Sequence, residues 1–265
     1  MGKIVIVASQ KGGVGKTTTS LNLAYSLSRF AERTLVLDAD PQGSLSIASN
    51  LRKRTTRGLA QVLRNEASLA DVIAPTRDGQ MAVASLGVST PEDVRAVEEA
   101  ASSGALGNVV REMAASFPQL IIDAPSGIGG LVTALLDLSD AAVVPLQPRA
   151  LAIRTLPAFL RTVQDVRRRN ERLRIAGLVV TMYDGSSPLD VKAEEEIRQT
   201  FPEDVLFKSI IPADPLFEEA TLRALPVALV PGGRHLAGLY LQLAMELRER
   251  NLLWETRDDE TSDLF

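Results

Sequence analysis

The feature that most constrains this chain is the glycine-rich stretch from Gln10 to Thr18, because its composition and its setting are those of a phosphate-binding loop. An apolar run from Lys3 to Ala8 precedes it and predicts a buried strand, and the pattern of Ser20–Leu27 predicts a helix. Strand, glycine-rich turn and helix are the context that such a loop requires. Glycines let the backbone amides point at a phosphate, and the helix N-terminus adds partial positive charge.

The side chains of this stretch have separate tasks in binding ATP and Mg²⁺, the cofactors that the loop predicts. We expect Lys16 to bridge the β- and γ-phosphates and the Thr17 hydroxyl to occupy one Mg²⁺ position, because Mg²⁺ prefers oxygen ligands. An accidental lysine in a glycine-rich turn is the alternative, and the required setting argues against it. The predicted nucleotide-binding residues of the loop are Lys11, Gly12, Gly13, Val14, Gly15, Lys16, Thr17 and Thr18.

Carboxylates follow two further apolar runs, each of which predicts a buried parallel strand. Asp38 and Asp40 come at the end of the run that starts at Arg33, and Asp123 ends the run that starts at Pro118. Ligands bind outside the carboxyl ends of strands in open α/β sheets. Asp123 fits the Walker B pattern, in which a carboxylate holds Mg²⁺ through water. Capping of the next helix is the alternative for all three aspartates.

The composition and the C-terminal segment limit the possible domain organisation and the kinds of site. The 265 residues suit one large domain, expected over residues 1–254, followed by an acidic segment at 255–265 that is expected to be disordered. The absence of cysteine excludes thiolate metal sites, iron–sulfur ligation and disulfides, and the single His235 argues against a histidine site. No apolar run reaches about 18 residues, and the acidic end would be repelled by anionic lipid, so we expect a cytoplasmic protein without a stable membrane anchor.

One departure from the ordinary phosphate-binding loop carries a resemblance to a known family. Gln10 stands where the pattern has glycine, and a second lysine, Lys11, comes early. This form resembles the deviant Walker A motif of the ParA/MinD family of P-loop ATPases, and Asp38–Gly43 resembles the family's second signature. The resemblance covers residue 1 to about residue 250. It implies an α/β fold with a twisted, mostly parallel sheet and helices on both faces.

The resemblance also implies roles for individual residues. In the family the early lysine crosses a dimer interface to the partner's nucleotide, which would be the role of Lys11 beside the catalytic Lys16. Asp40 would orient the attacking water, and Asp38 would support the loop and the Mg²⁺ shell formed with Thr17 and Asp123. In the family, the loops after the last strands contact adenine. By this resemblance, Pro212 and Asp214 would contact adenine in this chain.

The family relationship suggests a partition-type ATPase that forms an ATP-bound sandwich dimer and binds DNA non-specifically. It would position a chromosome, plasmid or protein cargo on the nucleoid, and hydrolysis would stay weak until a ParB-like or adaptor protein stimulates it. Chromosomal members carry arginines where this chain has Gly185-Ser186 and Asp214–Ala220. The DNA contacts would then come from another cationic set, Arg161, Arg167, Arg168, Arg169, Arg172, Arg248 and Arg250.

Other readings of the sequence stay open. The arginine cluster that begins at Arg161 can also be interpreted as a solvated helix face. The net charge of −4 does not indicate nucleic-acid binding. The alternative function is an ATP-switched protein-binding module, an orphan ParA-like or MinD-like positioning factor without DNA binding. A metabolic P-loop enzyme of the dethiobiotin-synthetase kind is disfavoured, because it would leave Lys11 without a task.

Overall fold

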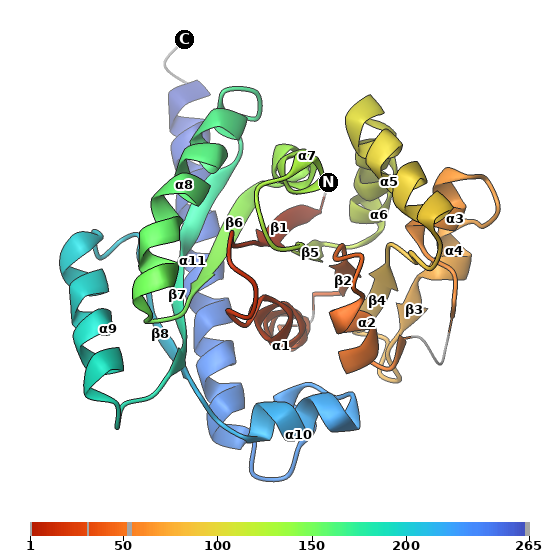
Figure 1. Ribbon diagram of the computed structural model, residues 1–265. Coiled ribbons are helices and arrows are strands. Elements are labelled where there is room, and N and C mark those ends of the chain that lie inside the picture. Colours follow the sequence, from red (N-terminus) through yellow and green to blue (C-terminus); the bar gives the residue numbers. More distant parts are fainter. Residues whose placement is uncertain (1, 31, 52–54, 263–265) are drawn as a thin grey trace.

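One mixed sheet of eight strands runs through the part of the chain that the computed structural model describes, residues 2–30, 32–51 and 55–262 (Figure 1). The strand order is β3-β4-β2-β5-β1-β6-β7-β8, and every neighbouring pair is parallel except β3 with β4. The predicted α/β architecture is therefore confirmed. The strands are β1 (Lys3–Val7), β2 (Thr34–Asp38), β3 (Ala74–Pro75), β4 (Met81–Ser85), β5 (Gln119–Asp123), β6 (Ala141–Leu146), β7 (Arg174–Tyr183) and β8 (Leu206–Pro212).

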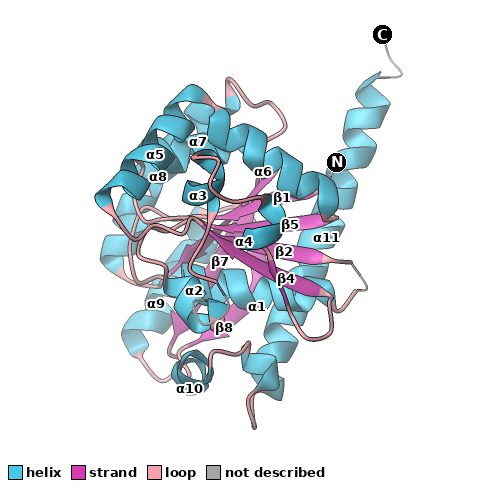
Figure 2. Ribbon diagram, turned by 90° about the vertical axis from the view of Figure 1, so that its right-hand side faces the viewer, coloured by secondary structure: helices cyan, strands magenta, loops and turns pink. Residues whose placement is uncertain are grey.

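Helices cover both faces of this sheet, as Figures 1 and 2 show from two directions. One face carries α3 (Leu59–Leu63), α4 (Leu69–Val72), α5 (Pro91–Ser103), α6 (Ala105–Ser116), α7 (Gly130–Leu138), α8 (Ala150–Arg167) and α9 (Pro188–Thr200). The other carries α1 (Lys16–Ser28), α2 (Ser44–Ala48), α10 (Leu216–Arg223), the 3₁₀ turn η2 (Val227–Leu229) and α11 (Arg234–Ser262).

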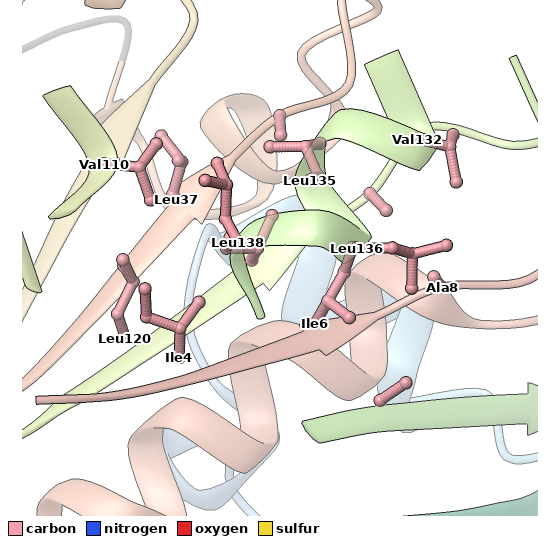
Figure 3. Close-up of a cluster of buried hydrophobic side chains, with 14 of the residues drawn as sticks. Ile4, Ile6, Ala8, Leu37, Val110, Leu120, Val132, Leu135, Leu136 and Leu138 are labelled. Carbon is pink, nitrogen blue, oxygen red and sulfur yellow. The ribbon is translucent and has the colours of Figure 1, made fainter. Parts of the chain in front are cut away.

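Strand β1 lies between the two hydrophobic cores and contributes to both. Ile4, Ile6 and Ala8 point to the α7 side, where Figure 3 shows them among α7 residues such as Leu136. Val5 and Val7 belong to the core on the α1 side. A strand with helices on both faces needs apolar residues at every position, which explains the uninterrupted apolar run that precedes the glycine-rich loop.

Helix α11 differs from the sequence prediction at the end of the chain. It continues to Ser262, so the boundary expected after residue 254 has no counterpart in the backbone, and the last turns extend past the other helices in Figure 2. The final residues of the predicted disordered segment, 263–265, lie outside the described residues. Among the residues described, no helix is both long enough and apolar enough to span a membrane.

Two glycines from distant segments meet beside the start of α3 and give a test of the packing. A Cβ on Gly58 would lie 2.4 Å from the Gly87 nitrogen and 2.5 Å from the Ser85 oxygen, and both of these are backbone atoms. Because backbone cannot turn away as a flexible side chain can, Gly58→Ala should lower the free energy of unfolding by about 2 kcal/mol or more. Urea unfolding monitored by circular dichroism measures this loss.

Gly238→Ala is the matched control, because no heavy atom lies within 4 Å of the added Cβ and the residue is inside helix α11. Alanine is the better helix former, so this variant should be about 0.5–1 kcal/mol more stable than the wild type. Equal stabilities for the two variants would contradict the close approach of the Gly58 and Gly87 backbones.

Candidate nucleotide-binding site

The glycine-rich loop joins β1 to α1 at the carboxyl edge of the sheet. Gly13 and Gly15 have φ angles of +71° and +80°, in the left-handed region that favours glycine. The Thr181 hydroxyl, from β7, donates a hydrogen bond of 2.9 Å to the Val14 carbonyl and so ties the loop to a second strand. The turn therefore has the backbone that a phosphate cradle requires, and α1 begins at its end.

A cavity of about 440 Å³ opens at this loop and gathers residues from several parts of the chain. Of the predicted site residues, Gly13, Gly15, Lys16, Thr17, Thr18 and Asp40 line it. The residues that complete its wall were not predicted individually from the sequence as part of the nucleotide site. These are Leu21, Asn22, Gln42, Ser44, Ala48, Ser126, Met182, Phe217, Ala220, Thr221 and Leu225.

Lys16 is a buried ammonium group at the bottom of this arrangement. Only 7% of the residue is exposed, and its Nζ donates to the Ser126 Oγ at 2.6 Å and to the Lys11 carbonyl at 3.5 Å. Burial lowers the pKa of Lys16, and the nearby charges of Asp123 and Asp40 oppose that effect. A buried cation bonded to a hydroxyl and a carbonyl is only partly neutralised, so it favours an anion in the cavity.

Asp123 organises the other half of the site. Its two oxygens accept hydrogen bonds from the Thr17 hydroxyl at 2.8 Å and the Ser20 hydroxyl at 2.9 Å. Burial raises the pKa of Asp123 to about 7, and the charge of Asp38 adds to the effect. A divalent cation beside this carboxylate would stabilise its charged form.

Mg²⁺ fits this pair of residues only together with a bound nucleotide. No group of three or more His, Cys, Asp or Glu side chains is arranged to hold a metal within the described ranges. Thr17 and Asp123 supply one hydroxyl and one carboxylate, and Mg²⁺ usually completes its shell with phosphate oxygens and water. The donors present therefore match a nucleotide-bound Mg²⁺.

Asp38 and Asp40 separate in the structure although they are two residues apart. Asp40 lines the cavity, and its Oδ1 accepts from the Gln42 amide at 2.9 Å. Asp38 is fully buried, and its Oδ2 accepts from the Ser46 amide at 2.7 Å and the Ser46 hydroxyl at 2.6 Å. Asp38 thus caps α2, the alternative left open for it, and its expected place in the Mg²⁺ shell stays a prediction that this geometry does not favour.

The residues carried over as adenine contacts lie beside the cavity but are not among the residues that line it. The Asp214 carboxylate accepts from the Leu216 amide at 2.8 Å and lies 3.4 Å from His235 Nε2, so it stabilises the start of α10. Phe217 and Thr221, four residues apart on α10, line the cavity instead. An adenine role for Pro212 and Asp214 stays a prediction.

Lys11 has no side-chain hydrogen bond or ion pair within the described part of the chain, although its carbonyl contacts Lys16. Neighbouring Gly12 approaches the chain's own loop after β5, since a Cβ on Gly12 would lie 3.4 Å from the Ser126 Oγ. Gly12 thus brings the glycine-rich loop close to Ser126.

The arginines proposed for DNA contact divide into two groups. Arg168, Arg169 and Arg172 face acids, with distances of 3.7 Å to Asp165, 3.3 Å to Asp137 and 3.7 Å to Asp140, respectively. Arg161 and Arg167 are exposed, and the described residues offer them no ion pair. This cluster ends at the start of β7, on the edge of the sheet opposite the cavity.

The two arginines of α11 make intramolecular contacts instead. Arg248 pairs with Glu32 at 2.9 Å and covers the ring of Phe30. Arg250 stacks on Phe207 and donates to the carbonyls of Ala176 and Leu206. Burial lowers the pKa of Arg250, opposed by the charges of Glu246 and Asp204. Both side chains therefore stabilise the packing of α11, which makes them poor candidates for DNA contacts.

Known proteins match this chain over most of its length. The family model AAA_31, an AAA domain, matches residues 2–175. The chromosome-partitioning ATPase Soj of Thermus thermophilus is 35% identical over 248 residues, which cover 93% of this chain and 95% of that protein. The chain belongs to the ParA/MinD superfamily of P-loop ATPases. ATP and Mg²⁺ are therefore its cofactors, as the residues of the site require.

Further members of the ParA/MinD superfamily agree with this assignment. The chromosome partitioning protein ParA of Caulobacter vibrioides is 34% identical over 262 residues, which cover 94% of this chain and 96% of that protein. The crystal structure of the cell division ATPase MinD of Pyrococcus furiosus superposes with a TM-score of 0.74 at 26% identity, and covers 94% of this chain and 99% of MinD. A cobyrinic acid a,c-diamide synthase of Mycobacterium smegmatis also has this fold, with a TM-score of 0.72 at 25% identity, covering 92% of this chain and 93% of the synthase. The fold alone thus does not distinguish partitioning from biosynthesis.

The Asp123 carboxylate gives this ParA/MinD-type ATPase a testable dependence on pH. The ordinary pKa of an aspartate carboxyl group is 3.8, whereas that of Asp123 is about 7 in the folded, metal-free protein. Its contribution to stability is therefore full below the lower value and is lost as the pH rises through the higher one. Asp123→Asn removes that charge, so its melting temperature relative to wild type should rise as the pH increases from about 5 to about 7 and stay constant above that.

Thermal unfolding without nucleotide or Mg²⁺ measures this difference. Asp137→Asn is the control, because Asp137 is an exposed carboxylate beside Arg169, and its difference from wild type should stay constant over the same range. Asp123→Asn should also lose the gain in ATP affinity that Mg²⁺ gives. A constant difference for both variants, with Mg²⁺ dependence intact, would contradict the role of Asp123.

Proposed function

We propose that this protein is a partition-type ATPase that forms an ATP-bound sandwich dimer and positions a chromosome, plasmid or protein cargo. One observation carries the proposal: the cradle of Lys16, Thr17 and Asp123 sits beside a second lysine, Lys11, whose side chain has no partner among the described residues. Relatives that are 30–35% identical over more than nine-tenths of this chain are named chromosome-partitioning proteins, which supports the same role here.

The surface around the cavity supports pairing with a second copy. Ile128, Leu151 and Leu189 follow the carboxyl ends of β5, β6 and β7, and they are 44%, 61% and 76% exposed. Large apolar side chains gathered on one edge favour a partner that covers them. A face-to-face dimer through this edge would cover them, and it would bring the Lys11 of each copy toward the other's cavity.

The residues of the cavity suggest how hydrolysis proceeds in such a dimer. Lys16 would hold the β- and γ-phosphates, and Lys11 of the second copy would add positive charge where charge develops in the transition state. Mg²⁺, when bound, neutralises phosphate charge beside Thr17 and Asp123. Asp40 lines the cavity and would orient the attacking water. Hydrolysis would then weaken the dimer, and a partner protein would accelerate this step.

The two lysines should give different losses when each is changed to alanine. Lys16→Ala should abolish ATP binding, because it removes the buried charge that faces the phosphates. Lys11→Ala should bind ATP as a monomer but lose the ATP-dependent dimer or its turnover. Calorimetry of nucleotide binding and analytical ultracentrifugation measure the two effects. Retained ATP affinity in the first variant, or wild-type dimer and turnover in the second, would contradict these roles.

Asp40→Ala should separate assembly from turnover. Asp40 faces the cavity without contacting the glycine-rich loop in any hydrogen bond of the described chain, so the variant should bind ATP and dimerise as wild type does. Phosphate release should fall to background, because the water is no longer oriented. Turnover at the wild-type rate would remove Asp40 from the mechanism.

DNA binding would use the cationic end of α8, which a dimer through the opposite edge of the sheet would leave accessible. Binding of Asp40→Ala to random duplex DNA should need ATP rather than ADP, and log affinity should fall with log salt by about 0.9 per phosphate contact. Arg161→Glu with Arg167→Glu should weaken this binding at low salt. Arg77→Glu with Arg95→Glu is the charge-matched control and should bind as the parent does.

The alternative function is an ATP-switched protein-binding module without DNA binding. It is supported by Ser186 and by the acids around Leu216, which stand where chromosomal members carry arginines, and by the acids that face Arg168, Arg169 and Arg172. An ATP-dependent dimer that fails to bind DNA at any salt concentration would favour this alternative.

A further inference from the structure

We propose that Ser126 recognises the γ-phosphate directly and thereby distinguishes ATP from ADP. Ser126 lies in the loop between β5 and α7, directly after Pro125. The inference rests on the proposed nucleotide site, and it gives a specific task to a residue that the predicted site did not include.

The hydrogen bond between Lys16 and Ser126 determines what the hydroxyl can still do. Lys16 Nζ donates to the Ser126 Oγ at 2.6 Å, so the hydroxyl oxygen is the acceptor and its own hydrogen remains to be donated. The described residues provide no acceptor for that hydrogen, and Ser126 lines the nucleotide cavity. An ammonium group and a hydroxyl in direct contact thus present two donors to the same space.

Such a pair suits one phosphate group. Lys16 Nζ and Ser126 Oγ are 2.6 Å apart, so two neighbouring oxygens of one phosphate can each accept a hydrogen bond from one of them. Hydrogen bonds to a charged acceptor are stronger than those between neutral groups. One phosphate would therefore be held by both groups, through different oxygens, while the contact between them persists.

The position of Ser126 favours the outermost phosphate. The amides of the glycine-rich loop and the start of α1 enclose the phosphate nearest to them. Ser126 reaches the cavity from a different loop, beside Gly12, and shares the cavity wall with Asp40, the residue proposed to orient the water. A group in this position meets the γ-phosphate of ATP and has no phosphate to bind in ADP.

The segment that follows Ser126 is rich in glycine and has open space beside its backbone. Gly127 has a φ angle of +106°, and Cβ atoms built on Gly127, Gly129 and Gly130 would meet no heavy atom within 4 Å. Ser126 also lines a second cavity of about 540 Å³ between α5 and α7, with Val97 and Leu131 among its walls. A change at Ser126 thus alters two cavities, and the first turn of α7 starts at Gly130.

The first test compares affinities for ADP and for the β,γ-imido analogue of ATP, both with Mg²⁺, by calorimetry on the full chain at protein concentrations where it is monomeric. Ser126→Ala should weaken binding of the ATP analogue by about tenfold or more and change ADP affinity less than about twofold. Ser126→Thr keeps the hydroxyl and should restore the wild-type ratio. Ser102→Ala, which lines only the second cavity, is the control.

The second test follows hydrogen exchange of the amides from residue 126 to residue 132. In wild type and Ser126→Thr the ATP analogue should protect these amides more than ADP does, and in Ser126→Ala the two nucleotides should give the same exchange. A role for Ser126 in stability alone would change neither the ATP-to-ADP ratio nor this nucleotide dependence.

The possible failures are distinguishable. A wild-type protein that binds neither nucleotide would contradict the proposed function itself. A Ser126→Ala protein that keeps the wild-type ratio, or that loses affinity for both nucleotides equally, would leave the nucleotide site intact as a proposal and overturn the role of Ser126.

Discussion

The buried ammonium group of Lys16 is the interaction on which the site depends. It belongs to the first residue of α1, only 7% of which is exposed, so little water remains to solvate it. Its nearest polar contacts are a serine hydroxyl and a carbonyl, which neutralise a cation only in part. Asp123 stands nearby with its own charge disfavoured by burial. A nucleotide phosphate with Mg²⁺ supplies both missing partners at once, so ligand binding relieves an electrostatic cost built into the fold.

Much of the fold and the centre of the site could be predicted from local sequence. Residues 4–8 are all apolar because β1 is covered on both sides, and such a run is typical of a parallel strand. The register of the strands then aligns Asp38 with Asp123, which explains why both follow apolar segments. The glycine conformations at Gly13 and Gly15 follow from the motif itself.

Contacts made across the fold could not be predicted in this way. Thr181 binds the Val14 carbonyl and Ser126 binds Lys16 over separations of more than a hundred residues, and no local pattern indicates either pairing. The task of Asp38 depends on where Ser46 lies after an intervening turn. From the sequence, the arginines of α11 are expected to be surface charges. Arg250 instead stacks on Phe207 and donates to carbonyl groups of neighbouring strands.

The most direct test of the central claim, a site completed by two chains, is ATP turnover in a mixture of Lys11→Ala and Asp40→Ala. Each variant alone should be inactive, whereas a mixed dimer has one site with an intact Asp40 and a Lys11 from the other chain. The account predicts that phosphate release reappears on mixing and depends on total protein concentration. A mixture as inactive as its components, with mixed dimers confirmed by ultracentrifugation of differently labelled chains, would contradict it.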